Sequence, residues 1–343
     1  MGNYLTFASG EAFTIGVNNA TKNWNGKLYY STDTASWTEW DGATAIESAL
    51  HNGEQRIYMR GSGNYIISGD PNKRWTMVGN GIHCSGNIET LLDFETVEMG
   101  KHPPMGAYCF AAMFLLCPIT SAPELPSTTL AQYCYQRLFY GCSNLTTAPE
   151  LPATALENGC YEYMFSRCAN LTTAPELPAT TLAQYCYSSM FSHTGLTTVP
   201  KLPATTLADS CYENMFYSCT NLTTAPELPA TTLADSCYYS MFEGCESIKL
   251  SETQTDEYKT PYTIPSSGIG TTATDAVNYM FNTTGGTFTG TPSINTTYYG
   301  AWTVEKEDET ERFSFIGFLA SPKYPGLPKN IWGWKMAQKR GDS

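Results

Sequence analysis

The sequence predicts an α/β repeat fold: a solenoid with short parallel strands and short helices, preceded by a small all-β sandwich. Three observations predict it. Cysteines recur at nearly constant spacing in the middle of the chain, a segment with leucines and prolines recurs between them, and the N-terminal stretch alternates apolar and polar residues. An internal period of about 20 to 50 residues is typical of proteins built from stacked repeats. With 343 residues, such an array grows by addition and does not need one large core.

The cysteines set the period of the repeat. Neighbouring members of a first series are separated by 25 or 26 residues, and they are Cys109, Cys134, Cys160, Cys186, Cys211 and Cys237. Four residues after each cysteine comes methionine or leucine, followed by phenylalanine. Leu182, Cys186 and Met190 stand at i, i+4 and i+8, a spacing that places them on one face of a helix. The sequence therefore predicts one short helix in each unit.

The other half of each unit is represented by the segment Leu171–Pro178, which contains two prolines. Because proline has no N–H donor, this segment cannot form a long central strand. A very short strand around Leu171–Thr173 remains possible, and it would pair with the same residues of the next unit. One unit has too little apolar surface for its own core, so the units must stack. We therefore expect Cys134, Cys160 and Cys186 to lie in a single column.

The rest of the chain divides into flanking segments. Residues 1–70 alternate as antiparallel strands do, with Asn-Gly and Asp-Gly turns, and predict an immunoglobulin-like β-sandwich module. Within the next segment, Ile82–Leu92 is typical of a strand followed by a short helix, as a cap requires. The predicted order after the sandwich is an N-terminal cap at 71–108, six repeat units at 109–250, a degenerate last repeat with a C-terminal cap at 251–300, and a tail or docking segment at 301–343.

The repeated strings Asn170–Leu182 and Cys186–Phe191 resemble those of the BspA-like leucine-rich repeat surface proteins of gut and oral bacteria and of their phages. The resemblance covers about residues 75 to 300. It implies a leucine-rich-repeat solenoid, an extracellular location on a bacterial surface or a phage particle, and adhesion to host proteins or other bacteria. The sequence shows neither an export signal nor a wall-sorting motif. Bacterial and phage origins therefore both stay open.

A second series of cysteines follows the first by eight residues: Cys117, Cys142, Cys168, Cys219 and Cys245. In the fourth unit Thr194 takes this place, although Cys186 is kept. If the two cysteines of a unit formed a disulfide, Cys186 would have lost its partner and its function. A cysteine that only fills the core as a small apolar side chain is unaffected by that loss, so we interpret the cysteines as core residues. Disulfides within units remain the alternative. A metal site is less well supported because no close Cys-x-x-Cys pairs occur, and no metal or cofactor is predicted.

Two further columns are candidates for a binding face. Glu124, Glu150, Glu176 and Glu227 fall in register, with Lys201 in the fourth unit. Side chains on adjacent units would lie roughly 5 Å apart, which predicts an acidic row. This row is either a solvated face or a strip that binds a cation or a basic partner. The aromatic column, either an interface or filler between helices, consists of Tyr135, Tyr161, Tyr187, Tyr212 and Tyr238.

Charge and composition exclude several classes of function. The net charge of −13 and the pI near 4.7 argue against nucleic acid as a partner. No apolar run is long enough for membrane insertion, and no nucleophile stands at recognisable spacing from a base. The sequence therefore predicts a non-enzymatic adhesion protein that presents its repeats to a protein or glycan on a host or bacterial surface. The alternative is a structural phage virion component, such as a tail or head fibre, a receptor-binding protein or a decoration protein, in contact with other virion proteins.

Overall fold

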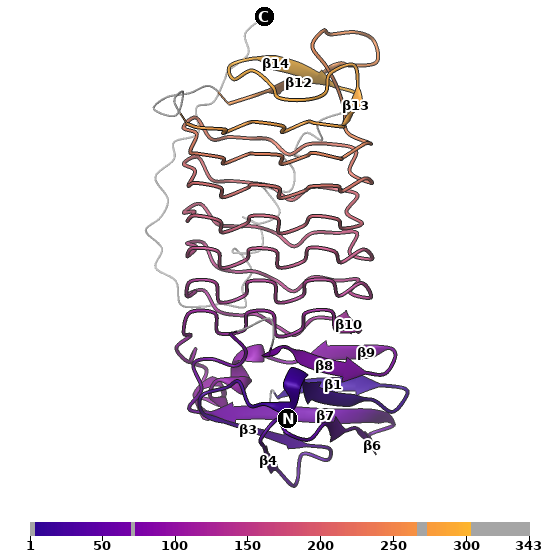
Figure 1. Ribbon diagram of the computed structural model, residues 1–343, viewed down its shortest axis with the longest axis vertical. Helices are drawn as coiled ribbons and strands as arrows, with labels where there is room; N and C mark the ends of the chain where they lie inside the picture. The colour runs from indigo at the N-terminus through magenta and orange to yellow at the C-terminus, as the bar shows by residue number, and fades with distance from the viewer. Residues whose placement is uncertain (1–3, 70–72, 266–272, 303–343) are drawn as a thin grey trace, which may run out of the picture. The chain divides into compact units, whose positions relative to one another are not determined.

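The computed structural model describes residues 4–69, 73–265 and 273–302. These residues form three β-sheets, two short 3-10 helices (Asn18–Ala20 and Ile88–Leu91, the second labelled η3) and one α-helix, α1 (Phe94–Glu98). Figure 1 shows the chain between the sheets as a stack of similar turns. Apart from Ala301 and Trp302, the predicted tail at 301–343 lies outside the described residues. Within the described ranges, no helix is both long and apolar enough to cross a bilayer.

The predicted α/β solenoid is wrong. The described residues form three separate sheets, and between Ser121 and Lys249 they contain neither a helix nor a regular strand. The helix expected through Leu182, Cys186 and Met190 is a series of turns. The expected parallel strands reduce to isolated bridges, and the bridges within the repeats are Ser121 with Thr147, Ala155 with Thr181, and Thr206 with Thr232.

The backbone of each unit explains why no helix forms. In the third unit the N–H groups of Cys160 and Glu162 donate to carbonyls three residues earlier, at 3.2 and 3.1 Å. The residue between them, Tyr161, donates instead to Cys186 O in the next unit, at 3.1 Å. Tyr163 donates to Ser188 O in the same way, and its φ is 56°. An α-helix needs negative φ throughout and N–H bonds to the fourth residue back. The buried residues therefore recur every four positions because the turn itself repeats every four residues.

The units are held together by aligned side chains as well as by these hydrogen bonds. One phenylalanine per unit forms a column with ring centroids 5.4 to 5.9 Å apart and nearly parallel planes, consisting of Phe114, Phe139, Phe165, Phe191, Phe216, Phe242 and Phe281. The carbonyls of Cys134, Cys160 and Cys186 each accept an N–H from the preceding unit. The expected alignment of these cysteines is thus confirmed.

All twelve cysteines are free and buried, which confirms their interpretation as core residues. The thiols of Cys142 and Cys168 donate to the carbonyls of Phe114 and Phe139 in the preceding units, at 3.0 and 3.1 Å. Thr194, which replaces a cysteine, donates its hydroxyl to Phe191 O at 2.7 Å. The substitution is tolerated because the added polar atom has a partner. Burial raises the pKa of the Cys142 thiol, so this sulfur is unreactive as a nucleophile.

Nine strands precede the repeats: β1 (Leu5–Ser9), β2 (Thr14–Val17), β3 (Lys27–Ser31), β4 (Thr38–Trp40), β5 (Ile46–Glu47), β6 (Ala49–His51), β7 (Glu54–Ser62), β8 (Trp75–Val78) and β9 (Ile82–Ser85). One sheet has the order β10-β9-β1-β7-β3-β4, with β6 also on β7, where β10 is Ile119–Ser121. The other sheet has the order β5-β2-β8. The Trp75 ring of β8 contacts Phe7 of β1 and Trp40 of β4, at 6.3 and 5.5 Å. The two sheets therefore share a core.

Strands β8 and β9 connect the predicted cap to the predicted sandwich, because β8 pairs with β2 and β9 pairs with β1. Strand β9 is followed by η3, so the strand and short helix expected within Ile82–Leu92 are confirmed. Strand β10 (Ile119–Ser121), at the end of the first unit, pairs in parallel with β9. The first unit thus continues the larger sheet.

The other end of the stack is followed by a four-stranded sheet of order β12-β14-β11-β13. Its strands are β11 (Lys249–Ser251), β12 (Thr260–Thr263), β13 (Gly285–Gly286) and β14 (Thr297–Gly300). A final turn places Met280 and Phe281 on the last unit, where Phe242 N–H donates to Met280 O at 2.9 Å. This last Met-Phe pair therefore covers the end of the repeat core.

Glu89 in η3 is a buried carboxyl with an exposed partner. Its side chain is fully buried, and one oxygen contacts His102 Nδ1 at 2.7 Å while the other has no partner within the described structure. Burial raises the pKa of Glu89 above its ordinary value, although His102, Ser127 and Asn87 oppose this. The folded state therefore binds the proton more readily than the unfolded state. Stability conferred by protonation is lost as pH rises through the raised pKa.

We expect the Glu89→Gln variant to show a flatter dependence of stability on pH than the wild-type chain. The glutamine cannot ionise, so the loss of stability with rising pH disappears at this site. Urea midpoints measured from pH 4 to pH 8, at roughly half-unit steps, test this. Glu11→Gln, at an exposed loop position, serves as the control. Parallel profiles for Glu89→Gln and wild type contradict the expectation.

Candidate functional site

Five of the six units each contribute one short segment of the pattern Ala/Val-Pro-Glu/Lys-Leu-Pro to the same side of the stack. These proline segments are residues 122–126, 148–152, 174–178, 199–203 and 225–229. Their leucines are buried or half-buried, whereas the charged residue before each leucine is exposed. Two residues in five lack an N–H donor. Accordingly, no hydrogen bond joins Pro149–Pro152 to a neighbouring segment of the described structure.

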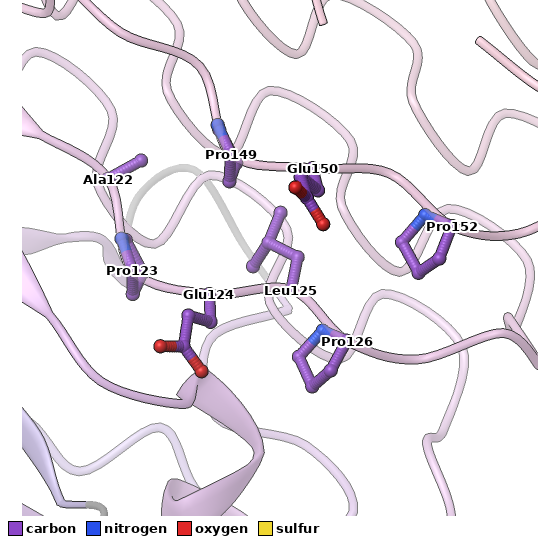
Figure 2. A pocket seen from close by; sticks show the side chains of 8 residues that line it. All are labelled: Ala122, Pro123, Glu124, Leu125, Pro126, Pro149, Glu150 and Pro152. Atoms are coloured by element: carbon purple, nitrogen blue, oxygen red, sulfur yellow. The ribbon is translucent and has the colours of Figure 1, made fainter. Parts of the chain in front are cut away.

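A groove of about 590 Å³ lies between the first two proline segments. Figure 2 shows its lining, with the Leu125 side chain between the two segments and prolines along both. The first segment is fixed to the cap, because Glu124 N–H donates to Gly86 O at 2.9 Å and Ile88 N–H donates to Glu124 O at 3.1 Å. The groove combines apolar proline rings with the carboxylates of Glu124 and Glu150. It can accept a chain that carries both aliphatic and cationic groups.

Every member of the predicted acidic row lies at the surface. Glu124, Glu150, Glu176, Lys201 and Glu227 are all exposed. Among the described residues, none of the four carboxylates has an ion-pair partner. Two charges roughly 6 Å apart in water repel by about 0.7 kcal/mol, so the row costs little stability. A basic partner could neutralise several carboxylates at once.

The tyrosine column does not belong to any binding face. Tyr135, Tyr161, Tyr187, Tyr212 and Tyr238 are each only 1% exposed, and their rings stack with centroids 5.8 to 6.0 Å apart. A buried ring cannot contact a partner, so this part of the candidate face is wrong. The rings fill the core between units, which is the second of the two interpretations open to the sequence.

Two tyrosines of the column, Tyr135 and Tyr212, have a buried hydroxyl without a hydrogen-bond partner in the described structure. Burial raises the pKa of the Tyr212 phenol. In the first unit the same position holds Phe110, whose ring stacks on Tyr135 at 5.7 Å. The column therefore accepts a ring without a hydroxyl.

We expect Tyr212→Phe to raise the free energy of unfolding by about 1 kcal/mol, because it removes an unsatisfied buried polar group and keeps the ring. Chemical denaturation measures the change. Tyr185→Phe, at a half-buried position, is the control and should leave stability within about 0.5 kcal/mol. A loss of stability in Tyr212→Phe would mean that the hydroxyl has a partner.

Sequence reasoning missed a set of outward-facing side chains on the turns. Tyr108, 41% exposed, stacks on Tyr133 at 4.8 Å, and the Arg137 guanidinium lies 5.0 Å from the Tyr163 ring centroid. These residues precede a cysteine by one or follow it by three, and their identities vary from unit to unit. Only their position in the turn could have identified these residues from the sequence, because no single residue type occupies that position in every unit. No group of three or more possible metal ligands occurs within the described residues.

A comparison with protein families identifies the repeated part of the chain. Residues 105–223 and 135–258 match the family model described as BspA type leucine rich repeat region, with six copies. The chain carries a BspA-type leucine-rich-repeat region. The resemblance found in Asn170–Leu182 is thereby confirmed, and all five proline segments lie within the BspA-type region. No curated protein and no solved structure matches the chain.

Proposed function

We propose that the chain is a non-enzymatic binding protein, displayed on a bacterial surface or a phage particle, whose BspA-type region binds a basic protein partner. The binding face is formed by the proline segments and the acidic row. The observation that carries the proposal is the groove between two proline segments, with the carboxylates of Glu124 and Glu150 exposed beside it. The family match supports a repeat region of adhesion type.

The chemistry of the face favours a protein over a neutral glycan. Proline rings offer flat apolar surface, and the row offers an exposed carboxylate on four of the five proline segments. An extended peptide with lysine at alternate positions presents charges roughly 7 Å apart, close to the ring spacing of 5.4 to 5.9 Å in the stack. Its aliphatic stems would cover the prolines while its ammonium groups reach the carboxylates.

The test uses charge reversal on the row. The full chain and the double variant Glu150→Lys plus Glu176→Lys are titrated with a synthetic peptide that carries lysine at every second position. We expect the double variant to bind about tenfold or more weakly at low salt. The control, Glu157→Lys plus Glu246→Lys, makes the same change of net charge at exposed positions outside the row. Equal weakening in both double variants contradicts a localised face, as does unchanged binding in the first.

Lys201 is the one cation in the acidic row, so reversing its charge should have the opposite effect on binding of the peptide. We expect Lys201→Glu to strengthen binding of the same peptide by about three- to tenfold at low salt, because a repulsive charge becomes an attractive one. The gain should shrink in high salt, where exposed charges are screened. Isothermal titration calorimetry at two ionic strengths measures both effects. Weaker binding by Lys201→Glu, or a gain that does not depend on salt, contradicts the charge pattern proposed for this face.

A further inference from the structure

Arg60 lies on the outward side of the larger N-terminal sheet, clasped by aromatic rings. Its guanidinium carbon is 4.3 Å from the Trp37 ring centroid, 5.4 Å from that of Phe94 and 5.9 Å from that of Tyr29. Tyr4 closes the group, with its centroid 4.8 Å from Trp37 and 4.9 Å from Phe94. The rings come from the start of the chain, β3, the loop before β4, and α1. The sequence brings four separate segments together around one cation.

This guanidinium has no anionic partner in the described part of the chain. No carboxylate oxygen there lies within 4.0 Å of it, and its N–H groups make no hydrogen bond to a described residue. The two acids in the strands of this sheet have cations of their own, since Glu39 pairs with Lys27 and Glu54 with Arg56. The Arg60 nitrogens are not among the buried polar atoms that lack a partner. They are therefore accessible to a ligand.

The kind of ligand follows from this combination. A guanidinium presents paired N–H groups that match a carboxylate in bidentate geometry. Aromatic rings beside it offer faces for an apolar ring surface. A single unpaired cation suits a ligand with one negative charge, whereas a polyanion such as nucleic acid needs a cluster of cations. A sugar ring that carries a carboxylate has both features, one charge and one flat C–H face.

We propose that Arg60, with the rings of Trp37 and Tyr4, forms a binding site for an acidic sugar, a pyranose bearing a carboxylate. Such a group occurs as a terminal sialic acid or as a uronic acid within a polysaccharide, and the carboxylate chemistry is common to both. The site does not depend on the function proposed for the repeats, because it lies on β3, β7 and the segments beside them. The chain would then have two separate recognition surfaces.

The experiment uses the full chain with four probes: N-acetylneuraminic acid, glucuronic acid, galactose and acetate. Saturation-transfer NMR or calorimetry should show binding by one or both acidic sugars and not by galactose or acetate. The acid that binds more tightly identifies the source. Arg60→Gln should weaken this binding by about tenfold or more, and so should Arg60→Lys, because one ammonium cannot replace the paired N–H groups. Trp37→Ala should also weaken it, through the lost ring face.

Arg56→Gln is the matched control, since Arg56 lies on the same strand and the same outward side but is paired with Glu54. This variant should bind the acidic sugars as the wild type does. Thermal melting of each variant confirms that it is folded, and Arg60→Lys keeps the charge if Arg60→Gln does not fold. The proposal is overturned if neither acidic sugar binds, if galactose or acetate binds as tightly as the acids, or if folded Arg60 variants keep wild-type affinity.

Discussion

Replacing Phe191 by alanine is expected to lower the free energy of unfolding by about 3 to 5 kcal/mol. Phe191 is fully buried in the middle of the phenylalanine column, and its ring stacks on Phe165 at 5.7 Å and on Phe216 at 5.9 Å. Truncation removes both ring contacts and leaves a cavity between units. Because each unit of a repeat stack is stabilised mainly by its neighbours, a defect in the middle weakens the units on both sides.

Equilibrium unfolding in urea, followed by circular dichroism, measures this loss. Leu116→Ala is a suitable control, because Leu116 lies on the same set of turns but is 56% exposed. It should change stability by less than about 1 kcal/mol. If Phe191→Ala costs no more than Leu116→Ala, the ring column does not hold the units together.

Gly195→Ala is expected to destabilise the chain by about 3 kcal/mol or more, a large effect for one methyl group. A Cβ at this position would lie 2.3 Å from the backbone oxygen of Ala169 in the preceding unit. The reason is visible in the sequence. Cys168 and Leu171 are separated by two residues, whereas Thr194 and Leu196 are separated by Gly195 alone. The shortened turn passes closer to its neighbour, and backbone atoms cannot move aside as a side chain can.

Urea unfolding of Gly195→Ala, compared with Gly10→Ala, tests this expectation. A Cβ at Gly10 would meet nothing within 4 Å, so its effect should be small. A third variant, in which Gly195 is replaced by serine and an asparagine is inserted after it, restores the longer turn of the other units. It should recover most of the stability lost in Gly195→Ala. Failure of this rescue would show that the close approach has another cause.

The periodic features of this fold could be predicted from the sequence, but the type of secondary structure could not. The spacing of the cysteines predicted the alignment of the units and the burial of the thiols. The spacing of Leu182, Cys186 and Met190 led to a helix, because i, i+4 contacts are typical of helices. A turn that repeats every four residues gives the same apolar spacing. The positive φ of Tyr163 and Arg167 distinguishes this turn from a helix. Neither tyrosine nor arginine favours a positive φ, so the residue types do not predict the turn.

Only part of the candidate site could be predicted from the sequence. The exposed row could be placed because its glutamates stand between two prolines, in a segment unsuited to regular pairing. The tyrosines were placed on a possible interface because tyrosine combines an apolar ring with a polar hydroxyl and is favoured at interfaces. In this turn the tyrosine rings are buried. Arg60 escaped notice because the rings around it come from distant parts of the sequence, and only the folded chain brings them together.

The backbone hydrogen bonds between the turns of successive units run one way, and this gives the stack an electrical polarity. A smaller number of bonds elsewhere in the units run the other way, as from Thr146 N–H to Thr120 O and from Thr197 N–H to Thr172 O. Tyr135, Tyr161 and Tyr187 each donate an N–H to the unit that follows, and none of these bonds is reversed. Peptide dipoles aligned in this manner add along the axis, as they do in an α-helix. Here the positive pole points toward later residues, which is the opposite of a helix. The carbonyls at the negative pole are met by cap N–H groups, as at Cys109 O, which accepts from Ile67 and Ser68.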